Sequence, residues 1–313
     1  MNITVTGGAG FLGSRLIAAL LKAKPEARII SLDRGACPVT HDNVTSMTGS
    51  IDDAADVARA IPAGTDIVYH LAAVLSGQSE QEFDTGLHIN VDATRLILER
   101  CRALAQPPRV IFTSSLAVFG GEMPQIVPQG WATRPASSYG VGKAIGELLV
   151  SEYTRKGFID GLTCRLPTIC VRAGQPNSAA SSFVSGIIRE PVAGVASDCP
   201  VPLDTRLWIS SPDAAVANLA LAADLDLEGL GADRVLDMPG ITVTPAAMLD
   251  SLHRLVGAAA RDLVTQSSDP RIIDIVCSWP GAFDDSRARA LGFASDTDFD
   301  GVVQQYLKEV QPA

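Results

Sequence analysis

Residues 2–13 read Asn-Ile-Thr-Val-Thr-Gly-Gly-Ala-Gly-Phe-Leu-Gly, and this stretch decides the fold of the chain. The first five residues are rich in β-branched side chains and leave no polar face for water, which predicts a buried parallel strand. From Phe11 to Leu21, apolar side chains recur at the spacing of a helix. A strand, a glycine turn and a helix in this order form the context that a dinucleotide-binding fingerprint requires.

The glycines of this turn are spaced G-x-x-G-x-x-G, at positions 7, 10 and 13, rather than in the commoner G-x-G-x-x-G pattern. Glycine lets the backbone turn tightly and approach a pyrophosphate, and the N-terminus of the following helix offers N–H groups to the anion. Glycine-rich turns also connect strands to helices without binding a ligand. The motif therefore needs support from elsewhere in the chain.

The next predicted strand, residues 27–32, supplies that support because it leads to Asp33. An acidic residue about twenty positions beyond the last glycine accepts hydrogen bonds from the adenosine ribose hydroxyls and repels a 2′-phosphate. Arg34 follows and could soften that repulsion. The pattern favours NAD over NADP as the cofactor.

Composition places the chain among globular α/β proteins. It has 313 residues, of which 47% are hydrophobic, enough for one large α/β unit or two coupled domains. The formal net charge of −10 disfavours nucleic acid and anionic membranes as partners, although a local arginine can still hold an anionic small substrate. The six cysteines form no C-x-x-C pair, and four lie in apolar stretches, so we expect buried free thiols.

Targeting and membrane-spanning segments are not expected. The strand predicted from residue 2 leaves no room for a signal peptide, and no uninterrupted apolar stretch reaches about 18 residues. We therefore expect a cytoplasmic protein with neither nucleic acid nor a membrane as its partner.

Predicted strands and helices alternate through the first half of the chain. Further strands are predicted at residues 44–48, 65–73, 109–115 and 162–168, and helices at 53–60, 84–105 and 138–156. This alternation predicts a Rossmann-type α/β fold, with a doubly wound parallel sheet in a domain of residues 1–172, to which 210–240 return. Residues 173–209 and 241–313 are expected to form a smaller C-terminal substrate-binding region.

Two segments carry no clear periodicity. Residues 77–82 are polar, and residues 171–201 are rich in Gly, Pro, Asn and Ser. Such compositions predict a mobile segment in the first case and a loop-rich region in the second.

The strongest chemical signal is the pair Tyr139 and Lys143, together with Ser115 at the end of a predicted strand. Residues four apart on a helix share a face, so the tyrosine and the lysine can point at one site. The pKa of a phenol is about 10, and a nearby ammonium stabilises the phenolate that would act as a base. The serine can hydrogen-bond the reacting oxygen at the carboxyl end of its strand. A lone Y-x-x-x-K also occurs by chance as an exposed pair, but the fingerprint and the serine give it weight.

With these residues in place, the chain resembles the extended short-chain dehydrogenases/reductases, the NAD-dependent epimerase/dehydratase family. The matching stretches are residues 6–13, 49–52, 70–73, 90–94, 112–120, 139–143 and 206–213. The resemblance implies NAD as the cofactor and a catalytic set of Ser115, Tyr139 and Lys143.

The resemblance also implies the parts of the cofactor site. Residues 50 and 51 would border the adenine, and residues 71–73 would line the path of the phosphates and riboses. Lys143 would hold hydroxyls of the nicotinamide ribose, and the segment at 167–168 would pass the nicotinamide. Asn90 would lie on the long helix behind the site, unless it has only a structural role. The implied cofactor-binding residues are Gly7, Gly10, Phe11, Leu12, Asp33, Ser50, Ile51, Leu71, Ala72, Ala73, Asn90, Tyr139, Lys143 and Pro167.

The expected partners are a small-molecule substrate and a second copy of the chain. The helices predicted at 84–105 and 138–156 resemble those that form the four-helix dimer interface of the family, which implies a homodimer through them. The histidines at positions 41, 70, 88 and 253 show no metal-ligand spacing, so no metal is expected.

The substrate region departs from the pattern of nucleotide-sugar enzymes. Phe119 stands where the family usually has tyrosine, a packing change, and Thr168 stands where nucleotide-sugar enzymes commonly carry asparagine. The loop 172–178 also lacks the usual glycine–proline turn. Residues 165–183 and 206–209 resemble instead the D-erythronate dehydrogenases, a group within the family that acts on a four-carbon sugar acid.

A sugar acid carries a carboxylate, and the fork of donors on an arginine matches that group best. Arg172 and Arg206 are the candidates, although either could instead form a surface ion pair. In the broader family the arginine at the position of Arg206 meets the substrate diphosphate. The expected substrate-binding residues are Ser76, Ser115, Tyr139, Thr168, Arg172, Asn177, Ser182 and Arg206.

The predicted reaction is the NAD-dependent oxidation of D-erythronate at carbon 2 to a 2-oxo acid. Tyr139 would remove the hydroxyl proton as a phenolate, Ser115 would orient the oxygen, and hydride would pass to the nicotinamide. Two alternatives stay open. One is a nucleotide-sugar epimerase or dehydratase that keeps NAD tightly bound and returns the hydride. The other is a regulator that senses NAD without turnover, a class that often loses the tyrosine or lysine that this chain keeps.

Overall fold

The computed structural model describes residues 1–177 and 179–311, and the chain divides into two compact units. Unit 1 comprises Met1–Ser115, Val141–Arg165 and Val216–Leu236. Unit 2 comprises Leu116–Gly140, Leu166–Ala215 and Asp237–Ala313. The chain therefore passes between the units several times, and each unit is assembled from segments that are distant in the sequence.

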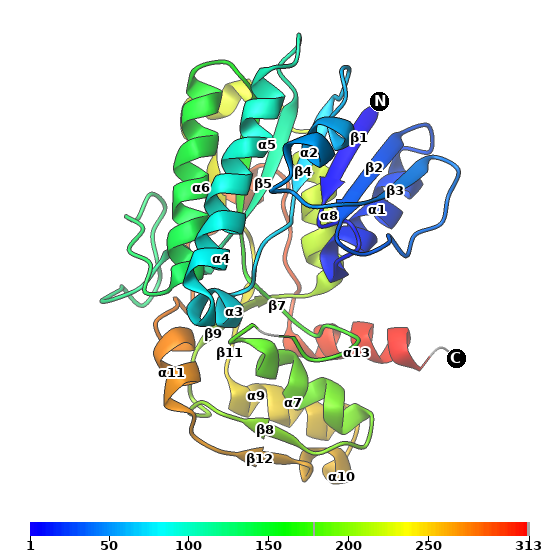
Figure 1. Ribbon diagram of the computed structural model, residues 1–313. Helices are drawn as coiled ribbons and strands as arrows, with labels where there is room; N and C mark the ends of the chain where they lie inside the picture. Colours follow the sequence, from blue (N-terminus) through cyan, green and yellow to red (C-terminus); the bar gives the residue numbers. More distant parts are fainter. Residues whose placement is uncertain (178, 312–313) are drawn as a thin grey trace. The chain divides into compact units, whose positions relative to one another are not determined.

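Unit 1 is built around a seven-stranded sheet with the order β10-β6-β5-β4-β1-β2-β3 (Figure 1). Its strands are β1 (Asn2–Thr6), β2 (Arg28–Asp33), β3 (Val44–Thr48), β4 (Ile67–His70), β5 (Arg109–Ser115), β6 (Asp160–Leu166) and β10 (Val235–Asp237). The pairs β1–β2, β1–β4, β2–β3 and β4–β5 are all parallel. The strand order reverses between β1 and β4, which is the switch point where open α/β sheets bind ligands. The prediction of a doubly wound, mostly parallel sheet is confirmed.

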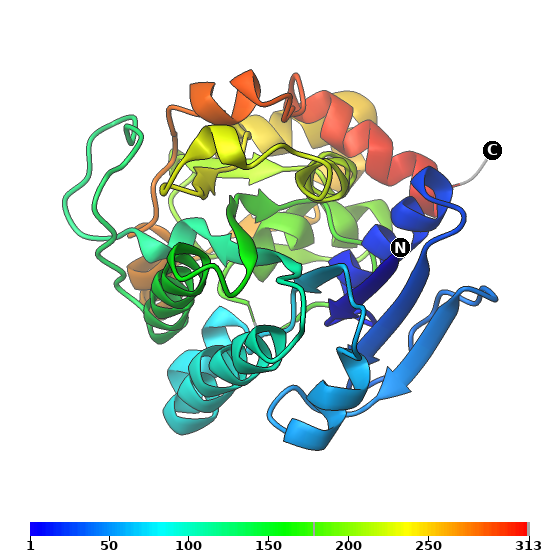
Figure 2. The same ribbon diagram turned by 90° about the horizontal axis from the view of Figure 1, so that it is seen from above.

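Helices accompany this sheet. They are α1 (Phe11–Ala23), α2 (Ala54–Ala60), α3 (Ser76–Gln81), α4 (Phe83–Leu87), α5 (Ala93–Arg102), α6 (Ser138–Arg155) and α8 (Pro212–Ala222), with a short 3-10 turn at Glu228–Leu230. Figures 1 and 2 both show α5 and α6 side by side, and the Tyr153 hydroxyl on α6 donates a hydrogen bond to Glu99 on α5. Over the described part of the chain, no helix is long and apolar enough to cross a membrane.

The long helix predicted at about residues 84–105 is present as a continuous helical run, but its interior is π-helical and it ends three residues earlier. The structure has α4, then a π-helical segment at His88–Asp92, then α5, which ends at Arg102. The π segment holds the buried side chain of Asn90, whose amide bonds the backbone of Val74. A widened turn of this kind is invisible to a reading that assumes a regular helical period.

The segment expected to be mobile at 77–82 is instead mostly helical. It forms α3, in which Ser79 is fully buried and donates a hydrogen bond to the carbonyl of Val74 at 3.2 Å. The sequence did not indicate this helix, because polar composition indicates exposure only when the hydroxyls have no partners inside the protein.

Unit 2 contains two small sheets, with the strand orders β11-β9-β7 and β12-β8. Their strands are β7 (Thr168–Ile169), β8 (Ser197–Cys199), β9 (Leu207–Ser210), β11 (Ile241–Val243) and β12 (Val264–Gln266). The helices are α7 (Ser182–Val192), α9 (Pro245–Leu255), α10 (Ala258–Arg261), α11 (Pro270–Val276), α12 (Ser286–Ala290) and α13 (Phe299–Val310), with a 3-10 turn at Leu116–Val118. The strand predicted at 162–168 is divided, because β6 ends at Leu166 and β7 pairs with β9 in a different sheet.

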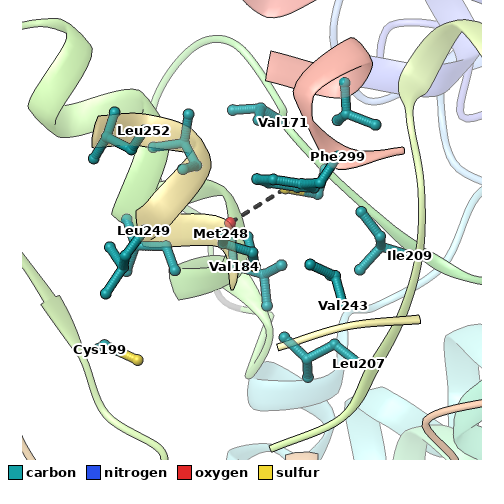
Figure 3. Packing of buried hydrophobic residues seen from close by; sticks show 14 of the residues in the cluster. Val171, Val184, Cys199, Leu207, Ile209, Val243, Met248, Leu249, Leu252 and Phe299 are labelled. Atoms are coloured by element: carbon teal, nitrogen blue, oxygen red, sulfur yellow. Dashed lines mark hydrogen bonds between the residues drawn. The ribbon is translucent and has the colours of Figure 1, made fainter. Parts of the chain in front are cut away.

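The core of unit 2 gathers apolar side chains from α7, both strands β9 and β11, α9 and α13 (Figure 3). Val184, Ile209 and Met248 are each fully buried there, and Phe299 packs with them. The presence of α7 corrects the expectation of a loop-rich region at 171–201. Its apolar residues recur at helical spacing, but the surrounding Gly, Pro and Ser obscure the pattern.

Candidate cofactor site and catalytic residues

The glycine turn of unit 1 is closed against the segment that follows β4. Gly7 has a φ of 75°, and a Cβ placed on it would lie 2.8 Å from the backbone nitrogen of Ala72. A Cβ on Gly13 would lie 2.1 Å from the carbonyl oxygen of Gly7, so α1 also packs directly on the turn. No side chain caps the start of α1 at Gly10. This cradle fits a pyrophosphate, which needs close backbone approach and the N–H groups of a helix N-terminus.

Asp33, at the end of β2, lies beside this turn. Its carboxylate accepts hydrogen bonds from the backbone N–H groups of Ala9 at 3.0 Å and Gly35 at 3.2 Å. The backbone N–H of Gly49 in turn donates to the carbonyl of Asp33 at 2.9 Å, which brings Ser50 and the buried Ile51 to the same edge of the sheet. The predicted residues for ribose and adenine therefore lie together within unit 1.

The segment after β4 is attached to the end of β1. The N–H of Leu71 donates to the carbonyl of Thr6 at 3.1 Å, and Ala72 abuts Gly7. Further on, the Asn90 amide oxygen accepts from the N–H of Val74 at 2.8 Å, and its nitrogen donates to the Val74 carbonyl at 3.0 Å. Asn90 is thus engaged in holding the backbone next to residues 71–73, and its place among the cofactor-binding residues stays a prediction.

Lys143 is buried on α6 beside β5, with 3% of its surface exposed. Its Nζ donates a hydrogen bond to the Thr113 carbonyl at 2.7 Å and lies 4.8 Å from the centre of the Phe112 ring. Burial lowers the pKa of Lys143 to about 8, and the negative charge of Glu147 opposes that shift. A lysine with such a pKa can exchange its charge close to neutral pH, as expected of a functional group.

His70 is the last residue of β4, and the charge of Lys143 acts on its imidazole. Burial, and then the charge of Lys143, lower the pKa of His70 to about 3. Its Nδ1 lies 2.8 Å from the Thr6 hydroxyl and its Nε2 lies 3.0 Å from the Thr94 hydroxyl. The imidazole is therefore neutral at physiological pH and ties β1, β4 and α5 together.

Sequence reasoning missed a buried ion pair next to Lys143. Glu147, one turn further along α6, pairs with Arg165 of β6 through contacts of 2.8 and 2.7 Å, and it accepts a hydrogen bond from Ser114 at 2.5 Å. The side chains of Arg165 and Glu147 are only 11% and 6% exposed. The only signal in the sequence is one opposite charge on each of the two elements, and no motif identifies it.

The three catalytic candidates fall on two adjoining elements. Ser115 is the last residue of β5, and Tyr139 and Lys143 lie one turn apart on α6. Ser115 and Lys143 belong to unit 1, whereas Tyr139 precedes the boundary within α6. Ser76, a substrate candidate, begins α3 in unit 1 and is buried.

The remaining substrate candidates belong to unit 2, where Arg172 is anchored to α7. The backbone N–H of Arg172 donates to the Ser185 hydroxyl at 3.0 Å, and its carbonyl accepts from Arg189 at 3.0 Å. Burial, and then the charge of Arg189, lower the pKa of the Arg172 guanidinium. A bound anion would offset that repulsion between like charges.

Arg206 occupies a different environment in unit 2. It precedes β9, and its guanidinium donates to the carbonyl of Gln125 at 3.1 Å. Asn177 and Ser182 are brought together, because the Asn177 N–H donates to the Ser182 hydroxyl at 3.3 Å. Thr168 lies in β7, paired with Ile209 of β9. Arg206 and Arg172 have different hydrogen-bond partners, so they are separate candidates for the carboxylate.

Comparison with known proteins finds relatives along nearly the whole chain. Residues 3–231 match the model of the NAD dependent epimerase/dehydratase family. The chain is 50% identical over 319 aligned residues to the D-erythronate dehydrogenase of Cupriavidus necator, covering 99% of this chain and 98% of that enzyme. It is 41% identical to the D-erythronate dehydrogenase of Haemophilus influenzae, covering 98% and 99%.

A solved structure is similar over the same length. It is described as the nucleoside-diphosphate-sugar epimerase from Agrobacterium tumefaciens, with a TM-score of 0.91, 37% identity, and coverage of 99% of this chain and 94% of that one. Together with the glycine cradle of unit 1 and the buried lysine of α6, these matches establish the family. The chain belongs to the NAD-dependent epimerase/dehydratase family, as the resemblance of its motifs implied.

Proposed function

We propose that this chain is an NAD-dependent dehydrogenase that oxidises D-erythronate at carbon 2 to a 2-oxo acid. The observation that carries the proposal is the similarity, over nearly the full length, to two enzymes named D-erythronate dehydrogenase. The departures at Thr168 and in the loop that follows it agree with a substrate other than a nucleotide sugar.

The cofactor proposed is NAD, held by the glycine cradle with Asp33 at the adenosine ribose. When bound, NAD supplies a hydride acceptor for the carbon that is oxidised. Asp33 is already fixed by the N–H groups of Ala9 and Gly35, so its carboxylate would meet a ribose 2′-hydroxyl favourably and a 2′-phosphate unfavourably.

The residues proposed for proton transfer are Tyr139, Lys143 and Ser115. The Tyr139 phenolate would accept the proton of the substrate hydroxyl, and the Lys143 ammonium would lower the pKa of that phenol. Ser115 would donate a hydrogen bond to the oxygen as it becomes a carbonyl oxygen. Lys143 suits this role because β5 holds its Nζ in one place, through the Thr113 carbonyl.

For the substrate carboxylate we favour Arg172 over Arg206. Burial and the nearby charge of Arg189 already disfavour the cation at Arg172, so a carboxylate there would be stabilised strongly. Asn177 and Ser182, which are linked to each other, are the proposed partners of the substrate hydroxyls.

We also propose a homodimer through the helices predicted at 84–105 and 138–156. On α6, Val141 and Leu148 are 39% and 72% exposed and lie two turns apart, and on α4 Phe83 is 57% exposed. A stripe of exposed large apolar side chains on neighbouring helices marks an interaction surface. Replacing Leu148 with Asp should shift the protein to a monomer in sedimentation experiments, and an unchanged mass would argue against this interface.

The experiment that tests the function is NADH absorbance after mixing the protein and NAD with a panel of C4 to C6 sugar acids and UDP-sugars. We expect turnover with the four-carbon acid. A panel on which no acid is oxidised would overturn the proposal.

A second candidate is a nucleotide-sugar epimerase, which the description of the Agrobacterium tumefaciens structure favours. Such an enzyme returns the hydride to its substrate, so it retains NAD through purification and produces no net NADH. Isomerisation of a UDP-sugar with tightly retained NAD, and no reaction with the acids, would select this candidate.

A further inference from the structure

A buried charge cluster stands behind the catalytic candidates of unit 1. Glu147 accepts two hydrogen bonds from Arg165 and one from Ser114, so its carboxylate joins α6, β6 and β5. A charge is costly to bury, and a buried pair is only weak evidence for stability. The position of the cluster points to another role.

Each element that Glu147 joins carries a residue of the predicted site close by in the chain. Lys143 lies one turn before Glu147 on α6, and Ser115 follows Ser114 at the end of β5. Arg165 lies near the end of β6, two residues before Pro167. One carboxylate on the helix that carries the lysine is thus hydrogen-bonded to two strands whose carboxyl ends lead to other residues of the predicted site.

The charges around Lys143 can be named element by element. On α6 they are Glu147 and the titratable Tyr139, on β4 there is the neutral His70, and on β6 there is Arg165. The Phe112 ring and the Thr113 carbonyl contributed by β5 do not titrate. Of the ionised groups, Glu147 acts to keep the Lys143 cation, and burial acts against it.

We propose that Glu147 is a positioning residue of the reaction, which orders Lys143 and Ser115 and keeps the Lys143 ammonium charged during turnover. Arg165 is the counter-ion that makes a buried carboxylate tolerable at this place. The role rests on the proposed dehydrogenase function, because it acts through Lys143.

The test compares four proteins: the wild type, Glu147→Gln, the double variant Glu147→Gln with Arg165→Gln, and Glu152→Gln. The last is a matched control, since Glu152 lies on the same helix and forms an exposed ion pair with Arg155. The double variant leaves no unpaired buried charge, so it separates a loss of folding from a loss of the charge on residue 147.

The first measurement is kcat/KM for D-erythronate against pH. For Glu147→Gln we expect the alkaline limb to move to lower pH by about 1 to 3 units, as for loss of a close opposite charge. For the double variant we expect a smaller shift in the same direction, because the like charge of Arg165 is removed as well. Glu152→Gln should keep the wild-type profile. A folded double variant with a wild-type alkaline limb would overturn the proposal, because a merely structural pair would be replaced without such a shift.

A second measurement does not depend on turnover. Lys143→Met is added to each protein, and the melting temperatures with and without it are compared over a range of pH. Their difference reports the titration of Lys143. The step should occur at lower pH in the double variant than in the wild type. If the wild type oxidises none of the acids but the Lys143 titration still moves to lower pH in the double variant, the proposed function fails and the action of Glu147 on Lys143 stands. If the titration does not move, the inference about Glu147 fails while the proposed function is unaffected.

Discussion

Strand β6 carries ion pairs at both of its ends, one of them shared with β5, and the two ends differ in burial and in the residues around them. At the amino ends, Asp160 pairs with Arg109 and Arg234, and its side chain is 36% exposed. At the carboxyl ends, Glu147 of α6 pairs with Arg165, and both side chains are nearly inaccessible to water.

From this difference we infer that the two clusters serve different purposes, stability at one end of the sheet and chemistry at the other. Arg109 also donates to two backbone carbonyls after α8, at 2.8 and 2.6 Å, so the cluster at the amino ends ties the chain together. The cluster at the carboxyl ends lies where open α/β sheets place their ligands, beside Lys143 and Ser115. Changes at the carboxyl ends should therefore alter catalysis, and changes at the amino ends should alter only the free energy of unfolding.

The largest effect is expected from Tyr139→Phe, which removes the proposed base without changing the shape of the side chain. Turnover should fall on the order of 10³-fold, the size typical of losing a general base. The affinity for NAD, measured by titration of protein fluorescence, should stay nearly unchanged. A lost NAD affinity would show that the phenol serves cofactor binding rather than proton transfer.

Lys143→Met should separate catalysis from stability at the carboxyl ends. The pKa of this lysine falls from 10.5 in the unfolded chain to about 8 in the folded one. The cost of burying the charge is therefore fully present below pH 8 and disappears as the pH rises above 10.5. We expect turnover to be lost and the free energy of unfolding at pH 7 to rise by about 2 kcal/mol, allowing for the lost hydrogen bond to Thr113. Denaturant unfolding that shows a clear loss of stability would contradict this.

Asp33→Ala tests another residue at the carboxyl edge. Removing the carboxylate should raise the ratio of NADP to NAD turnover roughly tenfold, the equivalent of relieving about 1.4 kcal/mol of charge repulsion. The measurement is kcat/KM with each cofactor at fixed substrate concentration. An unchanged ratio would mean that Asp33 does not contact the ribose.

Asp160→Asn should have the smallest effect, and that effect should be confined to the free energy of unfolding. A carboxylate that is a third exposed is screened by water, so we expect a loss of about 1 kcal/mol in the free energy of unfolding. The kcat and its pH profile should match those of the wild type. A changed pH profile would break the distinction between the two ends of the strands.

The sequence predicts the parts of the molecule that follow from local rules. The strand ending at Thr6, the helix that begins at Ser138 and the residue Asp33 beside the glycine turn are where the patterns place them. Each rests on periodicity or on a fixed spacing, which act within a few residues.

The parts that the sequence does not predict depend on contacts between distant segments. The pairing of Glu147 with Arg165 requires α6 and β6 to be packed together first, and neither charge belongs to a motif. The polar helix α3 is held by a hydrogen bond from the buried Ser79 hydroxyl to the Val74 carbonyl. Strand β7 separates from β6 because it pairs with a strand forty residues later. The roles of the substrate candidates stay predictions for the same reason.

The π-helical segment at His88–Asp92 makes this part of the chain sensitive to length rather than to composition. An α-helix turns by about 100° per residue, and the π segment takes up one extra residue in a single widened turn. Deleting a single residue between positions 88 and 92 would leave the apolar face of α5 in phase with the sheet. It would also swing Asn90 away from Val74 and release the loop that follows β4. Conservative substitutions in this turn should be tolerated where a one-residue deletion is not.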